Sequence, residues 1–116
     1  MRILVAFADQ EFTATLHDNA SAREFASMLP LEVTIEDFAH NEKIAHLPRK
    51  LGSLARGPFP DAAPGDFCYY IPWGNLAFFH GSYISTADLV RLGRVDGGVE
   101  PLLKRGEHLL RIERLS

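Results

Sequence analysis

The side chains best suited to hold a ligand are concentrated between residues 65 and 82, GDFCYYIPWGNLAFFHGS, a stretch that contains the only tryptophan of the chain. Its aromatic rings would supply apolar contact surface, and its amide, hydroxyl and imidazole groups would supply the few polar contacts that orient a ligand. With one basic side chain from the preceding segment, the candidate pocket residues are Arg49, Tyr70, Trp73, Asn75, Phe79 and His80. The alternative is that these aromatic residues only pack in the core.

Other chemically capable groups do not form a recognisable site. The histidines are too far apart in sequence for a local metal-binding motif, and no serine lies in a nucleophile-elbow motif. Cys68 lies in an apolar run, where a cysteine behaves as a small buried hydrophobe. Glu36 and Asp37 are neighbours in a predicted strand, so they point to opposite faces and make a poor carboxylate pair. We therefore expect no metal, no cofactor and no catalytic residue.

The stretch that carries the candidate residues is predicted to be a β-hairpin. Large apolar residues alternate on both sides of Pro72-Trp73-Gly74-Asn75, with the period of two expected of strands. Proline presets the first central turn position and Gly74 supplies a positive φ after it, so the chain should reverse there. Trp73 then either closes the core as a lid or lines an open pocket.

The remaining elements are predicted to be short strands. Alternating apolar and polar residues, or short apolar runs, predict strands at 2–7, 12–17, 31–38, 42–47, 89–95 and 108–115. Gly93 in one of them suggests a bulge or a close backbone approach. The count predicts a mainly β fold, namely a closed, roughly eight-stranded antiparallel barrel with two short capping helices.

Local signals place the two helices and one long loop. Ser21 and Glu24 match a capping box at the start of a helix over 21–29, and Asp96 is predicted to cap a second short helix. The proline-rich segment 48–64 has little periodicity and is predicted to be a surface loop, either a solvated flap or a cover over the pocket.

Length and composition favour one domain over residues 1–116, since 47% hydrophobic residues are enough for one core. The net charge of −3 and the scattered basic residues argue against nucleic acid as a partner. No apolar run approaches the roughly 18 residues of a membrane span. A single cysteine gives no disulfide framework, which favours a reducing, cytoplasmic location.

Four phrases carry a resemblance to a known family: ATLHDN at 14–19, LPRKL at 47–51, GDFCYYIPWGN at 65–75 and LGRV at 92–95. They resemble a bacterial and archaeal family of small cyclophilin-like proteins of unknown function, over nearly the whole chain. The resemblance implies the cyclophilin-like barrel.

The sequence also departs from true cyclophilins. Their Phe-His-Arg phrase, whose arginine acts on the proline carbonyl region during cis–trans isomerisation, is absent, and Arg49 stands in Leu-Pro-Arg-Lys instead. Three functions stay open. The first is a module that binds a small molecule or peptide without efficient prolyl isomerase activity, and the second is a weak isomerase that uses Arg49. The third is an assembly subunit with a protein partner, because barrels resembling this one also serve as subunits of amide-hydrolysing enzymes.

Overall fold

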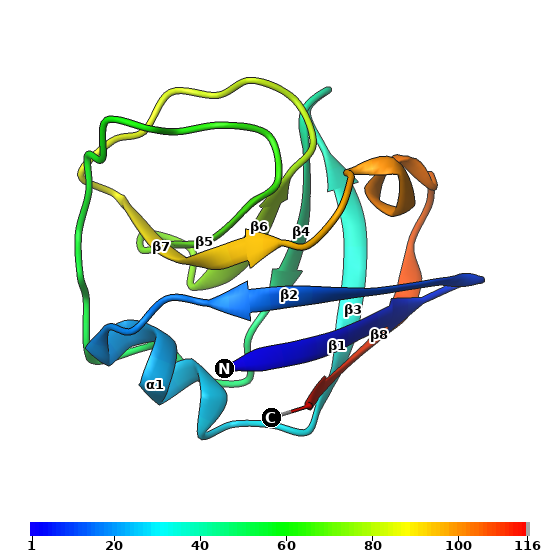
Figure 1. Cartoon of the computed structure of the whole chain (residues 1–116), viewed down its shortest axis with the longest axis horizontal. Coiled ribbons are helices and arrows are strands. Elements are labelled where there is room, and N and C mark those ends of the chain that lie inside the picture. The colour runs from blue at the N-terminus through cyan, green and yellow to red at the C-terminus, as the bar shows by residue number, and fades with distance from the viewer. Residues whose placement is uncertain (116) are drawn as a thin grey trace.

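Eight antiparallel strands close into one barrel in the computed structural model, which describes residues 1–115. The order around the barrel is β1-β2-β7-β5-β6-β4-β3-β8 (Figure 1). The strands are β1 (Arg2–Phe7), β2 (Gln10–Leu16), β3 (Leu31–Phe38), β4 (Glu42–His46), β5 (Asp66–Tyr70), β6 (Asn75–Phe79), β7 (Leu89–Val95) and β8 (His108–Arg114). The predicted fold class is confirmed. Closure of the barrel leaves none of these eight strands with a free edge, so the hairpin strands β5 and β6 are paired on both sides.

Side chains fill the interior of the barrel. The Phe67 and Phe78 rings stack at 4.5 Å between centroids, and Phe12 and Phe25 meet this pair edge to face. All four rings are buried, and aliphatic residues from β1, β7 and β8 complete the core. These rings and aliphatic side chains occupy the interior, which in an eight-stranded barrel is only wide enough for side chains or one small ligand, so they leave no room for a ligand there.

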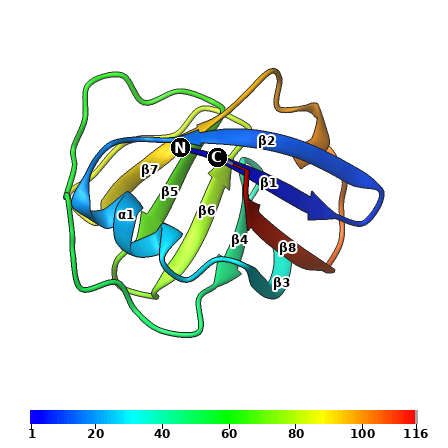
Figure 2. The same ribbon diagram turned by 60° about the horizontal axis from the view of Figure 1, so that its bottom comes forward.

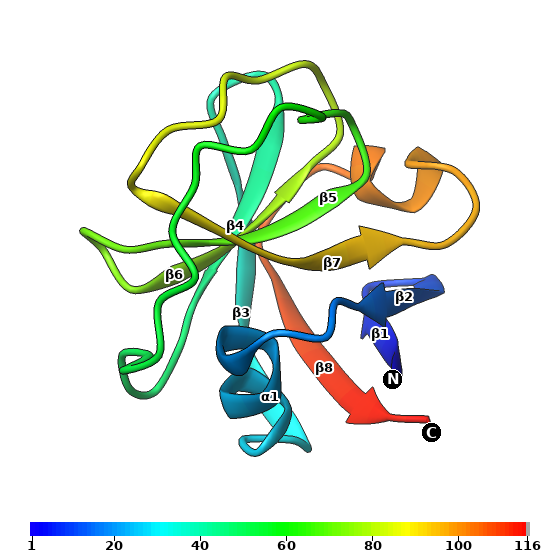
Figure 3. The same ribbon diagram turned by 60° about the vertical axis from the view of Figure 1, so that its left-hand side comes forward.

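A short helix, α1 (Ala20–Ala26), lies against one end of the barrel (Figure 3). Its Phe25 ring packs edge to face on Phe67 of the core. The helix begins one residue earlier than predicted, because the Asn19 side chain, not Ser21, accepts the hydrogen bond from the Ala22 N–H, and it ends at Ala26 rather than at residue 29. The predicted capping box is therefore wrong. Ser21 and Glu24 instead bind the backbone of the loop at 52–55, which fastens this loop to the helix.

The second helix is a single 3-10 turn, η1 (Glu100–Leu103), which lies away from α1 and buries Leu102 (Figures 1 and 3). Asp96 does not cap it, contrary to the prediction. Its carboxylate accepts hydrogen bonds of 2.7 Å from both Thr13 and Thr15, and so joins the end of β7 to β2. Sequence spacing alone could not show these cross-strand partners.

The hairpin turn and the close approach at Gly93 are confirmed. Gly74 has φ 69° in the turn between β5 and β6. A Cβ on Gly93 would lie 2.2 Å from the Thr15 carbonyl oxygen, so only glycine lets β2 and β7 pair there. The segment 48–64 runs over the surface with no helix or strand beyond one isolated bridge between Arg56 and Val90.

Candidate functional site

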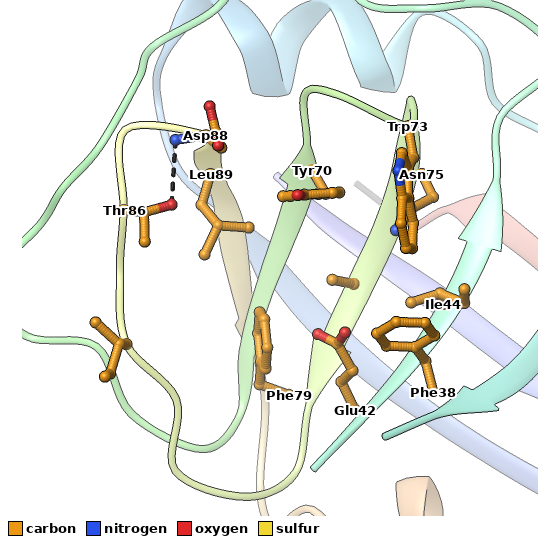
Figure 4. Close-up of a pocket in the computed structure, with 12 residues that line it drawn as sticks. Phe38, Glu42, Ile44, Tyr70, Trp73, Asn75, Phe79, Thr86, Asp88 and Leu89 are labelled. Atoms are coloured by element: carbon orange, nitrogen blue, oxygen red, sulfur yellow. Dashed lines mark hydrogen bonds between the residues drawn. The ribbon is translucent and has the colours of Figure 1, made fainter. Parts of the chain in front are cut away.

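The outer face of β4, β6, β5 and β7 carries a pocket of about 390 Å³. These four strands lie side by side in Figure 2. Because side chains alternate along each strand, the residues that do not fill the barrel project from this face. The pocket is lined by Phe38, Glu42, Ile44, Tyr70, Trp73, Asn75, Ala77, Phe79, Ile84, Thr86, Asp88 and Leu89 (Figure 4).

The floor of the pocket is hollow because its central side chain is small. Ala77 pairs with Ile44 of β4 and with Cys68 of β5, and it stands between the larger Asn75 and Phe79 on the same face of β6. Any larger residue at position 77 would fill the space that the surrounding side chains leave open.

Three aromatic rings form the wall at the hairpin turn. The Trp73 ring meets Tyr70 at 5.4 Å and 89°, and it meets Phe38 at 5.5 Å and 85°. Trp73 is 52% exposed and lines the pocket, so of the two alternatives the open-pocket one is correct and the lid over the core is wrong. With Ile84, the exposed rings of Trp73 and Phe38 give the mouth an apolar rim.

Glu42 stands on the floor of the pocket, next to Phe38 of the aromatic wall. Strand register places it directly between Phe38 of β3 and Phe79 of β6. Within residues 1–115 its carboxylate has no hydrogen bond or ion pair, and burial raises its pKa from 4.5 to about 7. Glu42 is therefore an acid without a partner in a largely apolar site.

Asn75 is the second polar group of the pocket. Its side chain is almost fully buried, and its amide donates a hydrogen bond of 3.0 Å to the Leu76 carbonyl oxygen. Its Oδ1 is the one buried side-chain nitrogen or oxygen atom in the described chain that lacks a partner. A buried acceptor without a donor costs free energy, which a ligand N–H or O–H would recover.

The irregular segment 80–88 forms the remaining wall. Tyr83 stacks on Phe79 at 3.7 Å, and its hydroxyl donates a hydrogen bond of 2.6 Å to the buried Asp66 carboxylate. Asp66 also accepts from Arg94 at 2.6 Å and from the Ala63 N–H. Burial, followed by this bond to Asp66, raises the pKa of Tyr83. The segment is thus held in place by a satisfied polar network under it.

Four of the six candidate residues, Tyr70, Trp73, Asn75 and Phe79, come together in this pocket. Arg49 and His80 do not. The Arg49 guanidinium pairs with Glu24 on α1 at 2.7 Å, and this contact, with the backbone N–H groups of Gly52 and Ser53, lowers the pKa of Glu24 to about 2. His80 follows Phe79 and so leaves the face that Phe79 occupies; burial, then the charge of Lys43, lowers its pKa.

The sequence reasoning missed Glu42, Phe38, Ala77 and the wall at 84–88. Alternation along 42–46 predicts that Glu42 and Ile44 lie on the same face of a strand. This pattern is the sequence signal from which both could have been proposed as pocket residues. Over residues 1–115, no three His, Cys, Asp or Glu side chains gather closely enough to hold a metal ion, and no helix is long and apolar enough to cross a membrane.

A closed eight-stranded antiparallel barrel, with a helix against one end and a pocket on its outer face, defines a cyclophilin-like fold. The chain belongs to the cyclophilin-like family, whose model matches residues 5–113. The solution structure of a hypothetical protein from Archaeoglobus fulgidus is similar, with a TM-score of 0.70 and 17% identity, over 99% of this chain and 95% of that one. This likeness concerns the fold. No curated protein matches the sequence.

Proposed function

We propose that this domain is a binding module that holds a small molecule or a short peptide in its outer pocket, without efficient prolyl isomerase activity. The observation that carries the proposal is a largely apolar pocket of about 390 Å³ lined by two polar groups without a partner within residues 1–115, the Glu42 carboxylate and the buried Asn75 Oδ1. Such a pocket has the size and composition typical of small-molecule sites. The buried free Cys68 fits a reducing compartment such as the cytoplasm.

The position of Arg49 argues against an isomerase that uses this residue. Its guanidinium is engaged by Glu24, and it lies outside the pocket. Neither lysine nor arginine lines the pocket, so no cationic donor faces a bound peptide carbonyl there.

A fragment titration followed by amide-shift NMR tests the proposal. The library contains neutral, anionic and cationic molecules and one proline-containing peptide, whose exchange spectra report cis–trans interconversion. The indole N–H of Trp73 gives a unique signal, because the chain has one tryptophan. We expect saturable shifts of this signal and of the Asn75 side-chain amide, without faster interconversion of the peptide.

Two matched variants locate the binding. Ala77→Leu fills the floor of the pocket and should abolish the shifts, whereas Ala20→Leu adds the same bulk at an exposed position on α1 and should leave them unchanged. If no library member shifts the Trp73 signal, or if Ala77→Leu binds as well as the unmodified chain, the pocket is not the site.

A further inference from the structure

The pocket is lined by acidic side chains and by no basic ones. Its ionisable lining side chains are Glu42, Asp88 and Tyr70, and none of the twelve lining residues is basic. Asp88 lies at the exposed rim, whereas Glu42 stands on the floor between two phenylalanines. A ligand that supplies positive charge would give Glu42 the partner that no residue among 1–115 provides.

The two unpaired acceptors are set apart along the floor. Glu42 pairs with Phe79, and Asn75 stands four residues before Phe79 on the same strand. At about 3.3 Å per residue, the two positions are about 13 Å apart along the strands, and both side chains project from the same face. Two hydrogen bonds of about 2.9 Å each then leave about 7 Å between the two donor atoms of a ligand that reaches both acceptors. A single ammonium group cannot reach both acceptors, but an elongated ligand with a donor at each end can.

The surface between these acceptors suits an alkyl chain. Ala77 and Ile44 form the floor there, and Tyr70, Trp73 and Leu89 stand around it (Figure 4). Aromatic rings also attract cations through their negative faces, so the ring of Phe38 beside Glu42 favours a positively charged end.

Resting on the proposed binding function, we propose that the pocket recognises a linear alkylammonium ligand whose ammonium pairs with Glu42 and whose second N–H group donates to Asn75 Oδ1. A lysyl side chain, with its own backbone N–H, has this chemistry, and so does a free diamine with a chain of about five carbons. Both sources share the recognised groups.

The test measures dissociation constants by following the Trp73 indole signal with four probes: 1,5-diaminopentane, Nα-acetyl-lysine N-methylamide, n-pentylamine and n-pentanol. We expect both two-ended ligands to bind tighter than n-pentylamine, and n-pentanol to bind weakest. Tighter binding of the lysine derivative identifies a peptide as the source, and tighter binding of the diamine identifies a free metabolite. Equal binding of n-pentanol and the amines overturns the proposal.

Two variants separate the two ends of the ligand. Glu42→Gln should weaken all three amines about tenfold or more and leave n-pentanol unchanged. Asn75→Ala should weaken the two-ended ligands by about fivefold to tenfold, the range of one hydrogen bond, and leave n-pentylamine unchanged. Glu36→Gln, on β3 outside the pocket, is the matched control and should have no effect.

The pH-dependence of amine affinity distinguishes direct pairing with Glu42 from a merely structural role of this residue. The titratable groups on the surrounding elements are Glu36 on β3, Cys68 and Tyr70 on β5, His80 after β6 and Asp88 at the rim, and none of them pairs with Glu42 within residues 1–115. A carboxyl with a pKa of about 7 should make amine affinity rise about 30-fold from pH 5.5 to pH 8. Glu42→Gln should remove this rise.

The two proposals fail differently. If neutral or anionic fragments shift Trp73 and the amines do not, the alkylammonium proposal falls and the binding pocket stands. If nothing in either set binds, both proposals fall.

Discussion

Replacing Glu42 by glutamine should stabilise the protein at alkaline pH and leave it unchanged in acid. Burial in the pocket raises the pKa of this carboxyl from 4.5 to about 7, and no partner within residues 1–115 offsets the burial. Between these pH values the folded chain holds a proton that the unfolded chain has released. Stability from this group is therefore complete below pH 4.5 and is lost as the pH rises through about 7.

The magnitude follows from the difference between the two pKa values. A difference of about 2.5 pH units, at about 1.4 kcal/mol each, corresponds to about 3 kcal/mol for a fully dry site. Solvent at the open mouth screens the charge and reduces the expected effect to about 1 to 2 kcal/mol. Glutamine cannot ionise, so the variant should retain at pH 8 the stability that the unmodified chain loses.

Urea unfolding followed by circular dichroism at pH 4.5 and pH 8, without ligand, measures this difference. Glu36→Gln is the control, because it keeps Glu42 and hence the pH-dependence that Glu42 causes. An equal effect of Glu42→Gln at the two pH values, or a loss of stability at pH 8, would refute the reasoning that burial without a partner controls this carboxyl.

Three further predictions concern residues that position the pocket. Tyr83→Phe keeps the ring stacked on Phe79 but removes the hydroxyl that donates to Asp66, and it should lower the free energy of unfolding by about 1 to 3 kcal/mol in urea titrations; an unchanged midpoint would contradict the anchoring role. Gly93→Ala should lower the free energy of unfolding by about 3 kcal/mol or prevent folding, because the new Cβ would lie 2.2 Å from a β2 carbonyl oxygen. The measurements are soluble yield and melting temperature. Normal values of both would show that β2 and β7 can separate there. Cys68, buried and with its pKa raised by burial to about 12, should resist a thiol reagent in the native protein and react only after unfolding, so rapid native labelling would disprove its burial.

The hairpin and the barrel were predictable because their signals are local. Alternation around Pro72-Trp73-Gly74-Asn75 specifies two strands and a turn wherever the rest of the chain lies. Alternation also separates Phe79 from His80, since adjacent strand residues face opposite sides, and the grouping of both in one pocket neglected this. The alternation of side chains along the predicted strand was therefore enough to exclude His80 from the face that carries Phe79.

The environment of Glu42 could not be predicted in the same way. Its neighbours Phe38 and Phe79 come from two other strands, and only the pairing of β4 with both of them makes the site apolar. Arg49 shows the converse. The prediction places it with the hairpin residues, but its guanidinium forms an ion pair with Glu24 on α1 and so lies outside the pocket. Long-range register and ion pairing decided which polar groups enter the pocket.

The filled interior explains why binding falls to the outer face. Stacked and edge-to-face phenylalanines occupy the barrel axis, so a ligand there would have to displace the core that stabilises the fold. On the outer face, by contrast, Ala77 is separated from that core by the sheet and belongs to a second, smaller buried cluster with Cys68, Phe79 and Leu89. The two unpaired acceptors, Glu42 and Asn75, flank this hollow, and both cost the unliganded protein stability. Polar groups that destabilise a fold and face one cavity are accounted for most simply by a ligand that pairs with them.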